Sequence, residues 1–303
     1  MEDKKPIMSV PVSIVLAAVI IGGAWLLKGD TARETTVTGT QTLAQTLLNQ
    51  KKTPSARPTE LLIPWENLGA KLSSVGVLDR ESFLTLYEGS EKEDARLLID
   101  EARDGTATIT EDNAGVVLNL LWALGLGQKS VILSEGPMMN PRYGGADRFA
   151  ATGGWTLAEG GAMDHYGRHL FFPLTAEQEE QASRVTKNMF RPCCDNPAHF
   201  PDCNHGMAML GLMELLASQG ATDDELYDAA LAVNTLWFPS QYAVISDYKD
   251  VIEKTGRTLS AKDLVGKNIA SASGFQKVQA ERAQWGTPQR ENSDGGGGGG
   301  CSV

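Results

Sequence analysis

A run of twenty uncharged residues near the N-terminus constrains this chain more than any other feature. Residues 8–27 contain no Asp, Glu, Lys or Arg and are rich in Val, Ile, Leu and Ala. At about 1.5 Å per residue, a helix of this length spans roughly 30 Å, which matches the hydrocarbon core of a bilayer. Trp25 stands near one end of the run, where an interfacial aromatic residue is expected. The run predicts a single transmembrane helix.

The charges beside this run predict its orientation. Lys4, Lys5 and the terminal amine precede it, and Lys28 and Arg33 follow it. This slight bias favours a type II topology, with residues 1–7 in the cytoplasm and the bulk of the chain extracytoplasmic. A cleaved signal peptide is the alternative, since residues 22–24 are small, and the protein would then be secreted.

Composition divides the rest of the chain into three parts. Residues 28–60 are rich in Thr, Gln and Lys and are expected to form a flexible tether. Residues 61–285 have the composition of a globular domain, and residues 286–303 are expected to be a disordered tail, in which six glycines precede Cys301. The net charge is −11 and no basic stripe occurs, so nucleic-acid binding is not expected.

Helical signals dominate residues 61–285 and predict a mainly α domain, either all-α or α with minor β. Capping-box patterns start at Ser90, Thr175 and Thr222. Thr110 is expected to cap a strongly apolar, central helix, and residues 206–219 predict a second helix that is apolar nearly all round. β-Branched alternating runs are scarce, which leaves little sequence for strands.

A glycine-rich stretch interrupts these helices. Residues 134–173 contain eight glycines and predict one long irregular loop. Such loops inside a compact domain are uncommon and are often functional. His165 and His169 stand at its end with the i, i+4 spacing of paired metal ligands, although Gly167 between them weakens the helix prediction.

Three of the four cysteines fall within eleven residues, at Cys193, Cys194 and Cys203. Cys203 directly precedes a predicted helix, whose N-terminal N–H groups favour a thiolate. His205 follows two residues later and can share a ligand sphere with it, while Asp202 is expected to orient the imidazole. Thiolates and an imidazole together bind soft or borderline metals.

The sequence therefore predicts a metal site. The predicted ligands are Cys193, Cys194, Cys203, His205, His165 and His169. Copper is the first choice, because adjacent cysteines rarely close a simple zinc site, and zinc is the second. The sequence leaves open whether the protein is an enzyme that uses this metal.

Two other interpretations of the cysteines remain. In the first, Cys203 forms a disulfide with Cys193 or Cys194, and the glycine-rich loop of a non-catalytic envelope protein contacts a protein partner. In the second, the cysteines exchange disulfides as a thiol redox protein, with Cys301 as a resolving thiol. No Cys-x-x-Cys motif supports the redox interpretation.

Overall fold

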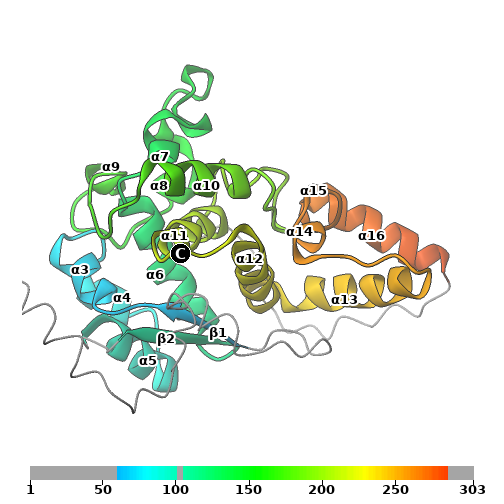
Figure 1. Cartoon of the computed structure of the whole chain (residues 1–303). Coiled ribbons are helices and arrows are strands. Elements are labelled where there is room, and N and C mark those ends of the chain that lie inside the picture. The colour runs from blue at the N-terminus through cyan, green and yellow to red at the C-terminus, as the bar shows by residue number, and fades with distance from the viewer. Residues whose placement is uncertain (1–59, 101–104, 286–303) are drawn as a thin grey trace, which may run out of the picture. The chain divides into compact units, whose positions relative to one another are not determined.

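A computed structural model describes residues 60–100 and 105–285, which form a mainly helical unit with a small sheet (Figure 1). The prediction of a mainly α fold with minor β is thus confirmed for this part of the chain. The predicted transmembrane helix, tether and tail, with Cys301, lie outside the described residues. Within the described ranges, no helix combines the length and the apolarity that crossing a membrane requires.

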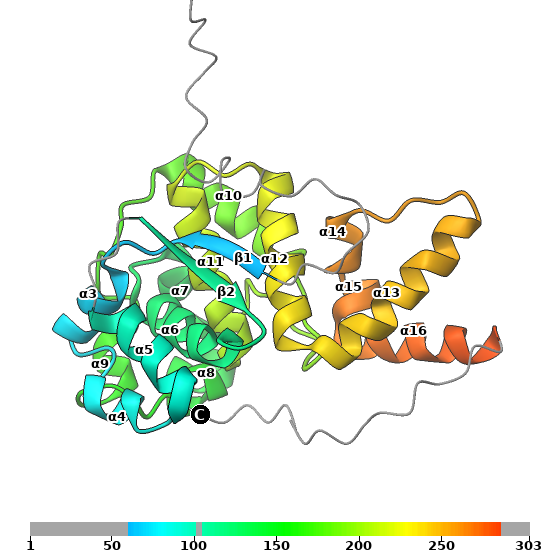
Figure 2. The ribbon, with the colours of Figure 1, turned by 90° about the horizontal axis from the view of Figure 1, so that it is seen from below.

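The sheet has two antiparallel strands, β1 (Glu60–Pro64) and β2 (Thr106–Thr110), in which Leu62 lies opposite Thr108. Strand β1 contacts α11 and α12, and β2 contacts α6 (Figure 2). In chain order the α-helices are α3 (Leu68–Ser74), α4 (Arg80–Leu84), α5 (Gly89–Asp100), α6 (Ala114–Gly127), α7 (Val131–Glu135), α8 (Ala150–Gly153), α9 (Ala162–His165), α10 (Ala176–Thr186), α11 (Asn204–Ser218), α12 (Asp223–Trp237), α13 (Pro239–Lys254), α14 (Ala261–Leu264), α15 (Lys267–Ala270) and α16 (Ala272–Gln284).

Helices α6 and α11 form the centre of the core, and almost every residue of both is buried. Two glycines allow their backbones to approach closely. A Cβ atom on Gly125 would lie 2.1 Å from the Met207 carbonyl oxygen, and one on Gly211 would lie 2.7 Å from the Gly125 nitrogen. Because only glycine fits at such a contact, these positions fix how the two predicted apolar helices pack.

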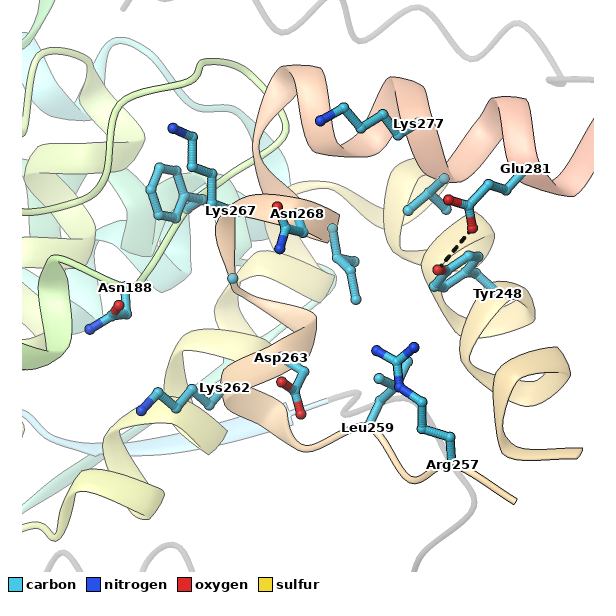
Figure 3. A pocket seen from close by; sticks show the side chains of 14 residues that line it. Asn188, Tyr248, Arg257, Leu259, Lys262, Asp263, Lys267, Asn268, Lys277 and Glu281 are labelled. Atoms are coloured by element: carbon cyan, nitrogen blue, oxygen red, sulfur yellow. Dashed lines mark hydrogen bonds between the residues drawn. The ribbon is translucent and has the colours of Figure 1, made fainter. Parts of the chain in front are cut away.

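A second, smaller apolar cluster joins α13 to α14, α15 and α16. It includes Phe238, Tyr242, Leu264 and Val278. Phe238 is the C-cap residue of α12, and Pro239 begins α13. Proline is tolerated there because the first N–H groups of a helix have no intrahelical partner. A cavity of about 420 Å³ opens between these helices and is lined mostly by polar and charged side chains, together with Phe190, Leu259, Ile269 and Val278 (Figure 3).

Sequence signals located some helix starts and missed others. The capping boxes at Thr175 and Thr222 are present, at the starts of α10 and α12. Thr110 does not cap a helix: it is the last residue of β2, and α6 begins four residues later, after Asn113. The Asn113 side chain instead accepts a hydrogen bond from the Thr110 N–H and forms the turn between strand and helix. Helix α5 begins at Gly89, one residue before Ser90.

The glycine-rich stretch 134–173 is not one irregular loop. It contains α8 and α9 and three short 3₁₀ turns, which are η2 (Pro137–Met139), η3 (Pro141–Tyr143) and η4 (Ala146–Arg148). The Trp155 indole N–H donates to the Val77 carbonyl (2.9 Å) and fixes the stretch to the core. Prolines at the first position of η2 and η3 preset the backbone for these turns, which the count of glycines did not reveal.

Candidate metal centre

Cys193, Cys194 and Cys203 lie in the loop that connects α10 to α11, and this loop is held at both ends. At its start, the Phe190 N–H donates to the Val265 carbonyl (2.8 Å), and the Asn234 side chain donates to the Phe190 carbonyl (2.9 Å). At its end, the Asp202 carbonyl accepts the Ala151 N–H (3.0 Å). The loop is therefore positioned before any ligand binds, as a preformed site requires.

The middle of the loop caps helix α16. The Cys194 carbonyl accepts the Ala272 N–H (3.0 Å), and the Asp195 carboxylate accepts the Ser273 N–H (2.8 Å). This backbone hydrogen bond lowers the pKa of Asp195. The cysteine loop thus satisfies two of the amide groups that every helix start leaves unpaired.

Arg191, which sequence reasoning missed, organises the loop from inside. Its side chain is 1% exposed, and its guanidinium donates to the Asn196 carbonyl (2.6 Å), the Asp202 carboxylate (2.7 Å) and the Cys203 sulfur (3.2 Å). Gly206 makes room for it, because a Cβ atom there would lie 2.4 Å from the guanidinium Nη2. An arginine directly before Pro-Cys-Cys was the only sequence signal of this role.

Asp202 does not orient the His205 imidazole, contrary to the expectation from its position. One carboxylate oxygen of Asp202 pairs with Arg191, and the other accepts the Asn196 side-chain amide (2.7 Å). Spacing along the chain suggested the imidazole, but the buried guanidinium is the stronger partner because both groups are charged.

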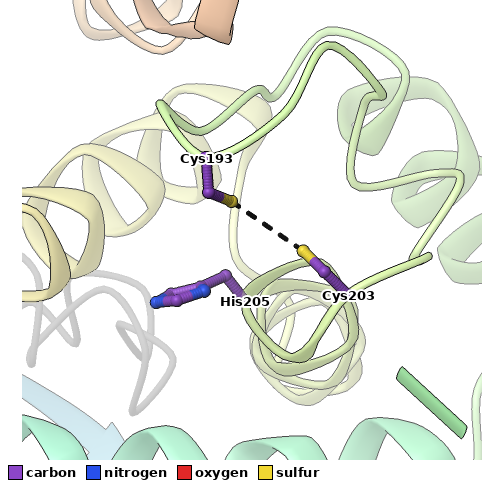
Figure 4. A group of neighbouring side chains, drawn as sticks. All are labelled: Cys193, Cys203 and His205. Carbon is purple, nitrogen blue, oxygen red and sulfur yellow. Dashed lines mark hydrogen bonds between the residues drawn. The ribbon is translucent and has the colours of Figure 1, made fainter. Parts of the chain in front are cut away.

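The three sulfur atoms lie close together without forming a disulfide. The Cys193 sulfur is 3.9 Å from that of Cys203, and Figure 4 shows this pair. The Cys193 sulfur is 4.0 Å from that of Cys194. A disulfide bond is about 2.05 Å long, and the cysteines in the described ranges are all thiols. Two thiolates in a tetrahedral site, with metal–sulfur bonds of about 2.3 Å, lie about 3.8 Å apart. The separations observed here fit that spacing.

His205 is placed on the first turn of α11, beside these sulfurs. It is 7% exposed, and its ring lies 4.5 Å from that of Phe238, centroid to centroid. Its Nδ1 atom is buried and has no hydrogen-bond partner among the residues described. A ligand atom of His205 lies within 4.8 Å of both the Cys193 and the Cys203 sulfur.

A second group overlaps the first, since Cys194, Asp202 and Cys203 also place their ligand atoms within 4.8 Å of one another. Cys203, the N-cap residue of α11, belongs to both groups, as its predicted position before that helix implied. The two groups together form a Cys/His/Asp cluster that could hold a metal ion.

Electrostatics keep two of these thiols protonated while no cation is bound. Hydrogen bonds with Cys194 and Cys203, together with burial, raise the pKa of Cys193. For Cys194, the contact with Cys193 lowers the pKa, but Cys203 and burial outweigh it and raise the pKa to about 11. Burial by itself would lower the pKa of Arg191; the neighbouring thiol groups and Asp202 raise it, so the guanidinium stays charged. A metal must displace the thiol protons to bind.

His165 and His169 form a pair of their own. Their rings are joined by a hydrogen bond between Nδ1 of His165 and Nε2 of His169 (3.0 Å), and the other ring nitrogen of His165 contacts the Glu159 carbonyl (2.9 Å). Helix α9 ends at His165, and Gly167 adopts a positive φ of 65°, so the two residues do not share a helix face. Neither belongs to the two groups around Cys203, and their metal ligation stays a prediction.

Comparisons with protein-family models, with curated proteins and with solved structures found no match to this chain. The function therefore has to be inferred from the residues of the site themselves.

Proposed function

We propose that this protein binds a soft or borderline metal ion through Cys193, Cys203 and His205, with Cys194 as a further ligand. The observation that carries this proposal is the spacing of the sulfur atoms, 3.9 and 4.0 Å. That spacing is too long for disulfides and suits thiolates that share one ion. The buried Nδ1 of His205, which lacks a hydrogen-bond partner among the described residues, adds support.

Copper and zinc are the ions that suit these donors. Thiolates are soft ligands and favour copper(I), while zinc accepts thiolate and imidazole together. Three thiolates and one imidazole around Zn²⁺ leave a net charge of about −1, and the Arg191 guanidinium, 3.2 Å from the Cys203 sulfur, supplies the opposite charge. If Cys194 stays outside the ligand sphere, one coordination position is open, as in catalytic zinc sites.

We also propose where the protein and its cysteine cluster are located. Residues 8–27 anchor the chain in a membrane, and the cluster faces the extracytoplasmic side. The support for this is the apolar run and the lysines beside it. Soluble copper or zinc, or a protein partner in the envelope that carries it, then has direct access to the loop.

The test is the metal content of the full chain, purified in detergent without oxygen or chelator. We expect about one equivalent of copper or zinc per chain, because the described cluster provides ligands for one ion. Cys203→Ser removes the ligand common to both groups and should abolish binding. Cys301→Ser removes a cysteine outside the described residues and serves as the matched control, which should keep the metal.

A chain that stays metal-free after reconstitution with copper(I) and with zinc would contradict the proposal. Thiol titration of the same sample after unfolding separates the alternatives. If Cys193, Cys194 and Cys203 all react, the metal-free chain carries thiols, and if two of them fail to react, the disulfide interpretation replaces metal binding.

A further inference from the structure

A second polar site lies in a cavity away from the cysteine cluster's ligand groups. The cavity has a volume of about 350 Å³ and is bordered by α7, α10 and α11, which neighbour one another in Figure 1. This volume falls in the range of small-molecule sites, which are typically 300 to 1,000 Å³. His199, from the loop before α11, completes the wall.

Glu214 is the most buried ionisable residue among those that line this cavity. It lies in α11, which contains no other Asp, Glu, Lys or Arg, and only 1% of its surface is exposed. Its Oε1 accepts a hydrogen bond from the Ser130 hydroxyl (2.5 Å), which in turn accepts the Ile132 N–H. Its Oε2 has no partner in the part of the chain that the structure describes. A buried carboxyl oxygen without a partner is costly, and a ligand would remove that cost.

The walls of the cavity add negative charge. Glu135 belongs to α7, and Glu179 and Glu180 belong to α10; Lys187 and His199 stand on the same wall. Burial and the nearby Lys187 lower the pKa of His199, so its imidazole is neutral at pH 7. Besides Glu214, three carboxylates and one amine line the cavity among the described residues, so the cavity favours a cationic guest.

The spacing of these groups argues against a metal ion. Among the described residues, the sets of three His, Cys, Asp or Glu ligand atoms that lie within 4.8 Å of one another are those around Cys203, and they include no residue of this cavity. The carboxyl groups here are spread over a larger space. Such an arrangement suits a cation whose charge is attached to a carbon skeleton that fills the volume.

We propose that this cavity binds a small organic cation, a primary amine or a guanidinium compound, with its charged end at Glu214. The N–H groups of the ligand donate to Oε2 of Glu214, and its carbon chain extends between α7 and α10. Ser130 holds the carboxylate in place from the other side. This site is independent of the proposed metal centre.

Binding is expected to release a proton. Burial raises the pKa of Glu214 to about 8, with a further increase from Glu179, while the Ser130 hydrogen bond opposes it. The carboxyl group is thus mostly protonated at pH 7, and a cation at Oε2 favours the ionised form. The other charged or titratable groups that line the cavity are Glu135, Glu179, Glu180, Lys187 and His199. Affinity for the cation should rise between pH 6 and pH 8.

The experiment is titration calorimetry of the full chain with putrescine and agmatine, and with 1,4-butanediol as the uncharged control. We expect the two cations to bind and the diol not to bind. Glu214→Gln should weaken binding at least tenfold, which corresponds to about 1.4 kcal/mol. Glu111→Gln, which changes an exposed glutamate outside the cavity, should leave binding unchanged.

Glu179→Gln provides a second variant on the partly exposed wall, in case the Glu214 variant does not fold. It should weaken binding of the cations several-fold. Equal binding of the diol, unchanged affinity in the Glu179 and Glu214 variants, or no binding of either cation at millimolar concentration would overturn the proposal. Binding of Mg²⁺ or Zn²⁺ that Glu214→Gln abolishes would also overturn it in favour of a metal ion.

Discussion

Helix α11 involves two buried ionisable side chains whose surroundings differ: Arg191 packs against the helix, and Glu214 belongs to it. The Arg191 guanidinium lies against the first turn at Gly206, where a carboxylate, a carbonyl and a sulfur accept its hydrogen bonds. Glu214 lies two turns further on and receives one hydrogen bond, from Ser130. Each also has one atom without a partner within the described residues, Nε of Arg191 and Oε2 of Glu214.

The difference shows how a buried charge can serve two purposes. Asp202 supplies the opposite charge for Arg191. The role of Arg191 is therefore structural: it holds the ligand loop against α11. Oε2 of Glu214 has no hydrogen-bond partner in the described residues, and Glu214 lines a cavity, so it is suited to a guest. A buried ionisable group that lacks a partner is retained at a cost to stability, which points to function.

The largest expected effect tests the first half of this comparison. Arg191→Gln leaves Asp202 without its cation and the Cys203 sulfur without its donor. We expect the free energy of unfolding to fall by about 3–5 kcal/mol, measured by denaturant titration. Arg184→Gln is the matched control, because Arg184 pairs with Asp223 on the surface (54% and 41% exposed) and should cost less than about 1 kcal/mol. Similar losses of unfolding free energy in both variants would contradict a structural role for Arg191.

A smaller effect is expected when the space for the guanidinium is filled. Gly206→Ala places a methyl group 2.4 Å from the Arg191 Nη2. We expect a loss of about 1–3 kcal/mol in the free energy of unfolding, together with weaker metal binding, because the loop must shift. Gly115→Ala, where a Cβ would meet nothing within 4 Å, should be neutral or stabilising. A stable Gly206 variant with normal metal content would show that Arg191 does not need this position.

The pH dependence of stability tests the second half. With its pKa raised to about 8, Glu214 keeps its proton in the folded protein at pH values where the unfolded chain has lost it, above the usual 4.5. Its stabilising contribution is therefore complete below that value and is lost as the pH rises toward 8. The expected slope is at most about −1.4 kcal/mol per pH unit. Thermal or denaturant unfolding at pH 5 to 8 should show this decline in the native chain and less of it in Glu214→Gln. Parallel curves would mean that Glu214 is already ionised.

The sequence identified the ligand loop because its signals are local. Cysteines clustered within a few residues and a helix start after Cys203 can both be recognised without knowing the fold. Arg191 and Glu214 could not be identified in this way, because their roles depend on neighbours from other segments, such as Ser130 for Glu214. One signal was visible in hindsight: a single glutamate in an otherwise apolar helix must either be paired or face a cavity.

Because the cysteine loop is hydrogen-bonded to the start of α16, two backbone amides of α16 report on the movement of this loop. The N–H groups of Ala272 and Ser273 donate to Cys194 and Asp195, so each exchanges with solvent hydrogen only when the loop moves away or the helix end opens. An ion that fastens the loop would slow that exchange, although neither amide contacts it. The rate of hydrogen exchange at the start of α16 thus measures loop opening without chemical modification of any thiol.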